Sequence, residues 1–192
     1  MATDTRERLI QSAMTRFYRD GFRSVGLEQI LEDVGISKTA FYKHFDCKET
    51  LMVAVLEWQS QWLEETFRKM VRERGGDRPV DQLWAVFDVV KTIIEDESFH
   101  GCIFVAASMD FPVPHDPVHQ AAARSREVIE QIIVEIADAA GASDPEAMTK
   151  ELCMIIEGTF VTRPLTGNRQ TIEVSRRLAE RVIEGYLKAA AV

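Results

Sequence analysis

The stretch ISKTAFYKHFDCKETL, at positions 36–51, brings together side chains that can bind a polyanion. Lysine ammonium groups neutralise phosphates and donate to base edges, and threonine and tyrosine hydroxyls are frequent phosphate partners. If the apolar residues within the stretch face a core, an open side remains for contacts with bases or phosphates. The candidates on that side are Lys38, Thr39, Tyr42 and Lys43, and the methyl group of Ala40 suits a thymine methyl.

Lys48 follows in the first turn of the next expected helix. There its ammonium joins backbone N–H groups that lack helical partners, at the positive end of the helix dipole, and both favour an anion. We therefore expect Lys48 to bind a phosphate of the same polyanion.

Two short helices joined at Gly35 must position this face. The first carries a stripe of apolar residues within 27–34 and ends at Gly35, which can take the left-handed conformation that turns one helix sharply across the next. Ser37 can cap the second helix, which we expect to run for about two turns. Such a pair is typical of the helix-turn-helix motif, whose second helix enters the DNA major groove.

A generic helical hairpin with solvated lysines would explain any one of these features. It explains less well why Tyr42 and His44 lie beside three lysines in a chain that is otherwise acidic. The whole chain of 192 residues has a net charge of −8. Residues 1–48 hold eight Lys/Arg against seven Asp/Glu, whereas residues 49–192 hold 15 against 24. This distribution excludes a nucleic-acid coat over the whole protein and predicts a DNA-binding domain at 1–48, followed by a second helical domain at 49–192.

Helical periodicity dominates the remaining chain, and no stretch alternates cleanly with period two. Glycine and proline signals, of which RGGDRP (74–79) and FPVPHDP (111–117) are the clearest, divide it into about six further helices. We therefore expect an all-α fold of about nine helices.

Several protein classes are disfavoured by the sequence. No apolar run approaches the length that spans a bilayer, and the first residues lack the apolar core of a signal peptide, so we expect a soluble, cytoplasmic protein with no membrane partner. The chain has no phosphate-binding glycine loop, nucleophile elbow or paired metal motif, so we expect no enzymatic activity, no metal and no cofactor. A helical bundle that binds a ligand but no DNA remains an alternative.

The segment GFRSVGLEQILEDVGISKTAFYKHFDCKETL (21–51), preceded by RERLIQSAMTRFYRDG, resembles the tetracycline-repressor (TetR/AcrR) family of transcription regulators. The order Gly, apolar residue, Ser and Lys, then Phe-Tyr-x-His-Phe, then a capped Lys-Glu is specific so close to an N-terminus. HGCIFVAASMDFP and the helices after it are similar to one common branch of the family. The resemblance therefore covers essentially the whole chain.

The resemblance implies a homodimeric repressor that binds a near-palindromic DNA operator and responds to a small-molecule effector. Helices one to three would bind DNA, helices four to seven would enclose the effector, and helices eight and nine would form a four-helix bundle with their mates. By position, bases or phosphates would be approached by Lys38, Thr39, Ala40 and Lys43, and the phosphate backbone would be anchored by Tyr42, His44 and Lys48.

The sequence departs from the family pattern in two places. Many members carry hydroxyl residues at the start of the second helix, where this chain has Val25 and Gly26, so Gly26 can offer only its backbone N–H to a phosphate. The usual small-then-Thr pair of the third helix is replaced by Thr39-Ala40, so the base preference cannot be transferred.

Two groups of apolar residues are candidates for the remaining roles. An effector pocket would be lined by Trp58, Trp62, Trp84, Phe87, Phe104, Met109 and Phe111, although for any one of them a place in the core is the simpler interpretation. A dimer interface would use Leu152, Ile155, Ile156, Phe160, Leu178, Val182 and Tyr186, some of which must serve the monomer core instead.

Three further features remain open. Cys47 lies beside Lys48 at a helix start, where a stabilised thiolate would make the regulator redox-responsive, although an ordinary first-turn residue is the simpler interpretation. His115 and His119 flank Pro117, where solvated loop residues are a simpler interpretation than a metal site. Arg163 either caps a helix end or meets an acidic ligand.

Overall fold

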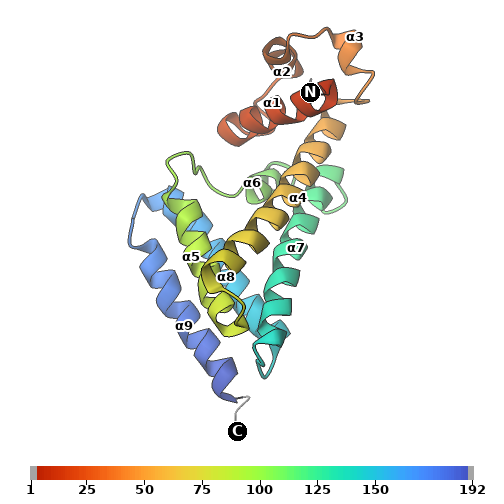
Figure 1. Ribbon diagram of the computed structural model, residues 1–192. Helices are drawn as coiled ribbons and strands as arrows, with labels where there is room; N and C mark the ends of the chain where they lie inside the picture. Colours follow the sequence, from red (N-terminus) through yellow and green to blue (C-terminus); the bar gives the residue numbers. More distant parts are fainter. Residues whose placement is uncertain (1–3, 190–192) are drawn as a thin grey trace. The chain divides into compact units, whose positions relative to one another are not determined.

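The computed structural model describes residues 4–189, and over this range the chain forms nine α-helices and no strand (Figure 1). The expected all-α fold of about nine helices is therefore confirmed for the described residues. The helices are α1 (Thr5–Asp20), α2 (Leu27–Val34), α3 (Lys38–Phe41), α4 (Lys48–Gly75), α5 (Pro79–Glu95), α6 (Ile103–Asp110), α7 (Pro117–Ala139), α8 (Pro145–Thr166) and α9 (Thr171–Ala189).

The chain divides into two compact units that do not follow the chain order. The first comprises the residues up to Trp62 together with Cys102–Arg126, and the second comprises Leu63–Gly101 and the residues from Glu127 onward. Helices α4 and α7 each contribute one part to both units. The expected domain boundary after residue 48 stays a prediction.

In the first unit, α1 packs on α2 and α2 packs on α3. The apolar stripe of α1 is buried, and Phe22, fully buried just after α1, stacks on Phe17 with ring centroids 4.8 Å apart. A bidentate ion pair joins the two helices across their polar faces, because Arg16 Nε and Nη2 each donate to Asp33 at 2.7 Å. Arg16 thereby lowers the pKa of the Asp33 carboxyl.

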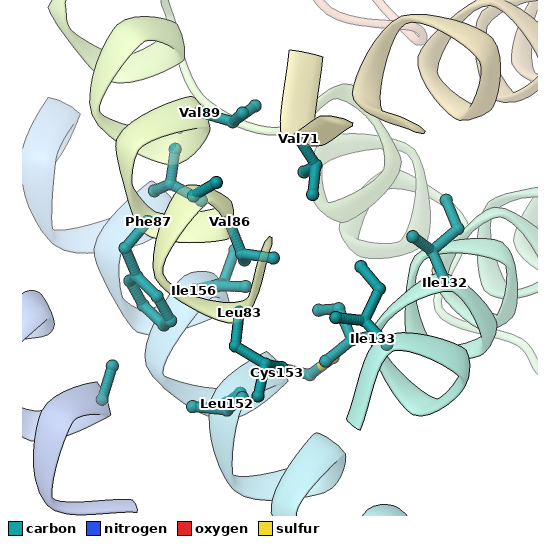
Figure 2. Packing of buried hydrophobic residues seen from close by; sticks show 14 of the residues in the cluster. Val71, Leu83, Val86, Phe87, Val89, Ile132, Ile133, Leu152, Cys153 and Ile156 are labelled. Atoms are coloured by element: carbon teal, nitrogen blue, oxygen red, sulfur yellow. The ribbon is translucent and has the colours of Figure 1, made fainter. Parts of the chain in front are cut away.

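The second unit is built around a core to which α5 and α8 contribute most of the residues labelled in Figure 2. The completely or almost completely buried side chains include Leu83, Val86, Phe87, Ile133 and Leu152. Helices α8 and α9 pack against each other and against α5, and residues of α4 and α7, among them Val71 and Ile132, complete the core.

One helix is shorter than expected, and another contains a proline within its last turn. The third helix was expected to have about two turns, but its α-helical part covers only Lys38–Phe41 and continues as tight turns. The eighth helix was expected to end at Pro164 and Gly167-Asn168; α8 passes through Pro164 to Thr166 and ends at Gly167, which has a left-handed conformation with φ 65° and donates its N–H to the Arg163 carbonyl. Proline is tolerated there because it lies within the last turn, where few further backbone bonds are lost.

Within residues 4–189, no helix combines the length and the apolar character that crossing a membrane requires.

Candidate nucleic-acid interface

Gly35 ends α2 in the left-handed conformation that the sequence predicts, with φ 71° and ψ 39°. Its N–H donates to the carbonyls of Leu31 at 2.9 Å and Glu32 at 3.1 Å, and Arg8 Nη2 donates to the Val34 carbonyl at 2.5 Å. The carbonyls of Leu31, Glu32 and Val34 in the last turn of α2 thus have partners, as helix ends require. No atom lies within 4 Å of the place where a Cβ of Gly35 would stand, so glycine is needed there for its conformation and not for space.

Ser37 caps α3 as expected, because its Oγ accepts the N–H of Ala40 at 3.2 Å. Phe41 is fully buried and Phe45 nearly so, and their rings stack with centroids 5.7 Å apart. After Phe41 the chain continues in tight turns, in which His44 donates its N–H to the Phe41 carbonyl at 2.8 Å. These two phenylalanines therefore anchor the short helix and turn its other side outward.

That outward side carries the side chains expected to meet DNA. Lys38, Thr39, Tyr42 and Lys43 are exposed, and Ala40 and His44 are half-buried beside them. The Tyr42 ring is 51 % exposed while its edge contacts Phe41, which holds the hydroxyl at the surface. Lys38 Nζ lies 3.4 Å from a carboxylate oxygen of Glu28, a weak exposed pair that a phosphate can replace. The structure therefore brings the predicted residues of the third helix onto one open face, which we call the α3 face: 38, 39, 42 and 43.

Lys48 was expected to bind a phosphate, which stays a prediction, and its ammonium is already bonded within the protein. It is the first residue of α4, as predicted, but it is half-buried and its Nζ donates to the Phe22 carbonyl at 2.9 Å and lies 5.8 Å from the centre of the Phe17 ring. Burial lowers the pKa of this ammonium, and the charges of Glu49 and Asp110 partly oppose the effect. The ammonium already has a protein partner because the first turn of α4 lies beside the segment that follows α1.

Gly26 also differs from the expectation. It precedes α2 with φ −78°, and its N–H donates to Gln29 Oε1 at 2.8 Å. The backbone donor that was to compensate for the missing hydroxyl side chains is thus already used. A phosphate can reach it only if the Gln29 side chain moves away.

Arg6 is a candidate that the sequence reasoning missed. It is exposed, and its guanidinium lies over the Phe45 ring, 5.2 Å from the centroid. Stacking on an aromatic ring holds an arginine in place while leaving its donors free for a phosphate. The sequence shows a basic residue in the first turn of α1, which alone does not indicate a DNA contact. Only the folded chain shows that this turn lies next to Phe45.

The residues expected to line an effector pocket have different surroundings. Phe87 belongs to the core of the second unit, and Trp62 and Met109 are 51 % and 77 % exposed. Trp84 lines an open recess of about 480 Å³ together with charged residues of α9, among them Arg176 and Glu180. Phe111 carries the guanidinium of Arg23, 5.1 Å from its ring centre. Trp58 is half-buried and Phe104 is buried, so a common pocket for the seven residues stays a prediction.

The residues expected at a dimer interface divide into two groups. Leu152 and Ile156 are buried in the core of the second unit, so we no longer assign them to an interface. Leu178 is 44 % exposed, and the remaining four, which are Ile155, Phe160, Val182 and Tyr186, are half-buried. The outward faces of α8 and α9 carry apolar residues that the sequence reasoning did not name: Met154, Val161, Leu165 and Val174, between 45 % and 80 % exposed.

The remaining candidates have ordinary surroundings. Cys47 is half-buried, and its N–H donates to Thr50 Oγ1 at 3.2 Å. His115 is exposed in the α6–α7 connection, whereas His119 was expected in a solvated loop but lies half-buried in α7, bonded to the Phe111 carbonyl at 2.8 Å. No group of three or more His, Cys, Asp or Glu side chains in the described part of the chain is arranged to hold a metal ion.

Two family descriptions match this chain. "Bacterial regulatory proteins, tetR family" matches residues 9–55, which include α2 and the α3 face, and "Tetracyclin repressor-like, C-terminal domain" matches residues 79–179. Among curated proteins, the HTH-type transcriptional regulator YjdC of Escherichia coli is 21 % identical over 178 residues, which is 93 % of either chain. The HTH-type transcriptional regulator TtgR of Pseudomonas putida is 33 % identical over 82 residues, covering 43 % of this chain and 37 % of TtgR.

Solved structures have the same fold over nearly the whole length. SCO4454, a TetR-family transcriptional regulator from Streptomyces coelicolor, superimposes with a TM-score of 0.83 and 26 % identity over 95 % of this chain and 96 % of its own. The reduced form of E. coli NemR gives a TM-score of 0.82 at 18 % identity, over 93 % and 96 % of the two chains. With a left-handed turn before an exposed basic helix and a family match over more than half its length, this protein belongs to the TetR family and is a DNA-binding transcriptional regulator.

Proposed function

We propose that this protein is a homodimeric repressor, in which the α3 face of each protomer reads one half of a near-palindromic operator. Residues 1–48 serve as the DNA-binding domain, and residues 49–192 bind a small-molecule effector and form the dimer. The protein acts in the cytoplasm by binding, without catalysis. The observation that carries this proposal is the exposure of Lys38, Thr39, Tyr42 and Lys43 on one face directly after the left-handed turn.

The chemistry of the α3 face suits a duplex. The two lysines of the α3 face neutralise phosphates or donate to guanine, and the Thr39 and Tyr42 hydroxyls donate to phosphate oxygens. In helix-turn-helix dimers, the two recognition helices lie about 34 Å apart, one turn of DNA, or a multiple of that distance. The operator is therefore expected to contain two half-sites at such a spacing.

A second copy of the chain is the proposed cover for the outward apolar residues of α8 and α9. Met154, Val161 and Leu165 recur at helical spacing on α8, and Val174 and Leu178 do so on α9. Burying one such side chain is worth about 1.5–3 kcal/mol, and a stable interface needs on the order of 1,500 Å². A Cβ at Gly158 of α8 or at Gly185 of α9 would meet no atom within 4 Å, so both positions leave room for a close partner helix.

An effector changes operator affinity only if it binds one state of the regulator more tightly than the other. Helix α4 is the proposed link, because it begins at Lys48, near the DNA-binding helices, and runs through Trp58 and Trp62 to Gly75.

Selection of bound sequences from a random duplex pool tests the proposal, and repeating it with a metabolite mixture tests the effector. We expect one enriched near-palindrome, and replacement of Lys43 by Ala should weaken its binding at least fivefold. Lys69→Ala is the matched control, because Lys69 is an exposed lysine of α4, 3.9 Å from Glu73, outside the α3 face. A pool without enrichment, or equal losses in the two variants, would refute the assignment of the α3 face.

A further inference from the structure

The segment that follows α1 is held by the last residue of α6. Asp110 Oδ2 accepts the backbone N–H of Phe22 at 3.1 Å and that of Arg23 at 3.4 Å. In return, Arg23 Nε donates to the main-chain carbonyl of Asp110 at 2.6 Å, and the Arg23 guanidinium lies over the Phe111 ring. Four contacts thus join two places that lie 87 or 88 residues apart in the chain and belong to the same compact unit.

The same segment is held from its other side by α4. The Phe22 carbonyl accepts Lys48 Nζ at 2.9 Å, while the Phe22 N–H is bound by Asp110. The Phe22 side chain is fully buried and stacks on Phe17 of α1. Phe22, which lies within the three-helix head formed by α1–α3, is therefore fixed by a carboxylate of α6, by an ammonium of α4 and by the Phe17 ring of α1.

The chemistry of Asp110 argues for a role in orientation. A carboxylate in the half of the molecule that binds DNA opposes the approach of phosphates, and a helix C-terminus is an unfavourable place for a negative charge. A carboxylate oxygen can nevertheless accept two adjacent backbone N–H groups, and its charge strengthens both bonds. The position of Asp110 therefore indicates that its carboxylate holds residues 21–23 and does not serve to attract DNA.

We infer that Asp110 is a positioning residue for operator binding. It does not touch DNA; it fixes the Gly21–Arg23 segment and, through the Phe22 residue, the ammonium of Lys48 at the start of α4. The orientation of the three-helix head is thereby set from α6, a helix outside the helix-turn-helix. This inference rests on the DNA-binding activity of the protein and not on its being a repressor or having an effector.

Three substitutions separate position from charge. Asp110→Ala removes both the charge and the acceptor, and Asp110→Ser leaves a hydroxyl too short to reach both amides. Asp110→Asn removes the charge but keeps a carbonyl oxygen that can accept both N–H groups. If position matters, the Asn variant behaves like the wild type and the Ala and Ser variants do not.

The measurements are hydrogen exchange of the Phe22 and Arg23 amides and the affinity for a duplex selected from the random pool, at two salt concentrations. We expect Ala and Ser to speed exchange of these two amides and to weaken binding about tenfold, the upper end of what one ordinary hydrogen bond contributes. The salt slope should remain that of the wild type, because no phosphate contact is removed. The Asn variant should stay within about twofold in both measurements.

A double-mutant cycle tests the route through Lys48. If Asp110 acts through it, Asp110→Ala should weaken the binding of the Lys48→Met protein much less than that of the wild type, because coupled residues are not additive. The inference is wrong if the Ala and Ser variants of Asp110 bind as the wild type does, or if the Asn and Ala variants behave alike. It is also wrong if the losses of binding free energy in Asp110→Ala and Lys48→Met simply add in the double variant. It is equally wrong if affinity falls while the two amides exchange at the wild-type rate.

Discussion

Replacing Gly35 by Ala tests whether the turn of the helix-turn-helix depends on a left-handed residue. Gly35 has φ 71° and ψ 39°, where a residue with a Cβ is disfavoured by about 1–2 kcal/mol. Nothing lies within 4 Å of the added Cβ, so no steric overlap adds to this cost. Alanine also restricts the unfolded chain, which offsets about 0.4–1 kcal/mol. Gly35→Ala is therefore expected to lower the free energy of unfolding by about 1 kcal/mol, which is small enough for the protein to remain folded.

The free energy of unfolding is measured by urea denaturation followed by circular dichroism, and operator affinity by fluorescence anisotropy. Gly35→Asn should lower the free energy of unfolding less than Gly35→Ala does, because asparagine tolerates the left-handed region. Gly35→Val should lose more stability, because a β-branched residue forces the turn to open. It should also weaken DNA binding, because the turn must close again, against this strain, for α3 to dock on DNA.

Gly26→Ala is the matched control at the other end of α2. Gly26 has φ −78°, which any residue adopts, and its added Cβ would meet only side-chain oxygens of Glu28 and Gln29 at 3.7 Å. Its operator affinity should match the wild type. A Gly35→Ala protein as stable as the wild type, or a Gly26→Ala protein that loses operator affinity as Gly35→Val does, would contradict the reasoning.

Four further predictions concern the interface and the fold. Lys43→Ala should lower the slope of log affinity against log salt by about 0.9 for each protomer bound, and an unchanged slope in salt titrations would show that Lys43 contacts no phosphate. Leu165→Glu, at a residue that is 80 % exposed on α8, should dissociate the proposed dimer in analytical ultracentrifugation without unfolding the protomer. Because Arg16 lowers the pKa of Asp33, the pair stabilises the fold above about pH 4, and this contribution disappears as the pH falls through the lowered pKa; the stability difference between wild type and Asp33→Asn should therefore shrink in acid. Gly75→Ala would place a Cβ 2.6 Å from the backbone of α5 and should cost about 1–3 kcal/mol in urea denaturation, whereas an unaltered midpoint would contradict the close approach of the two helices.

The sequence by itself determined the features that depend on neighbouring residues. The left-handed Gly35, the Ser37 cap and the alternation of buried phenylalanines with exposed polar residues are all set within a few positions along the chain. Helix periodicity and loop signals likewise act over short ranges, which is why the all-α fold and the α3 face could be predicted.

Only the tertiary structure decided which distant groups meet. Lys48 was correctly placed at the start of a helix, but its bond to the Phe22 carbonyl depends on how α4 packs beside the segment after α1. Asp110 reaches that segment across 88 residues, a distance over which no periodicity in the sequence carries information. The apolar residues of α8 divide between Leu152 in the core and Leu165 in solvent, because a helix has two apolar faces here and only packing against α5 and α9 shows which of them the protomer buries.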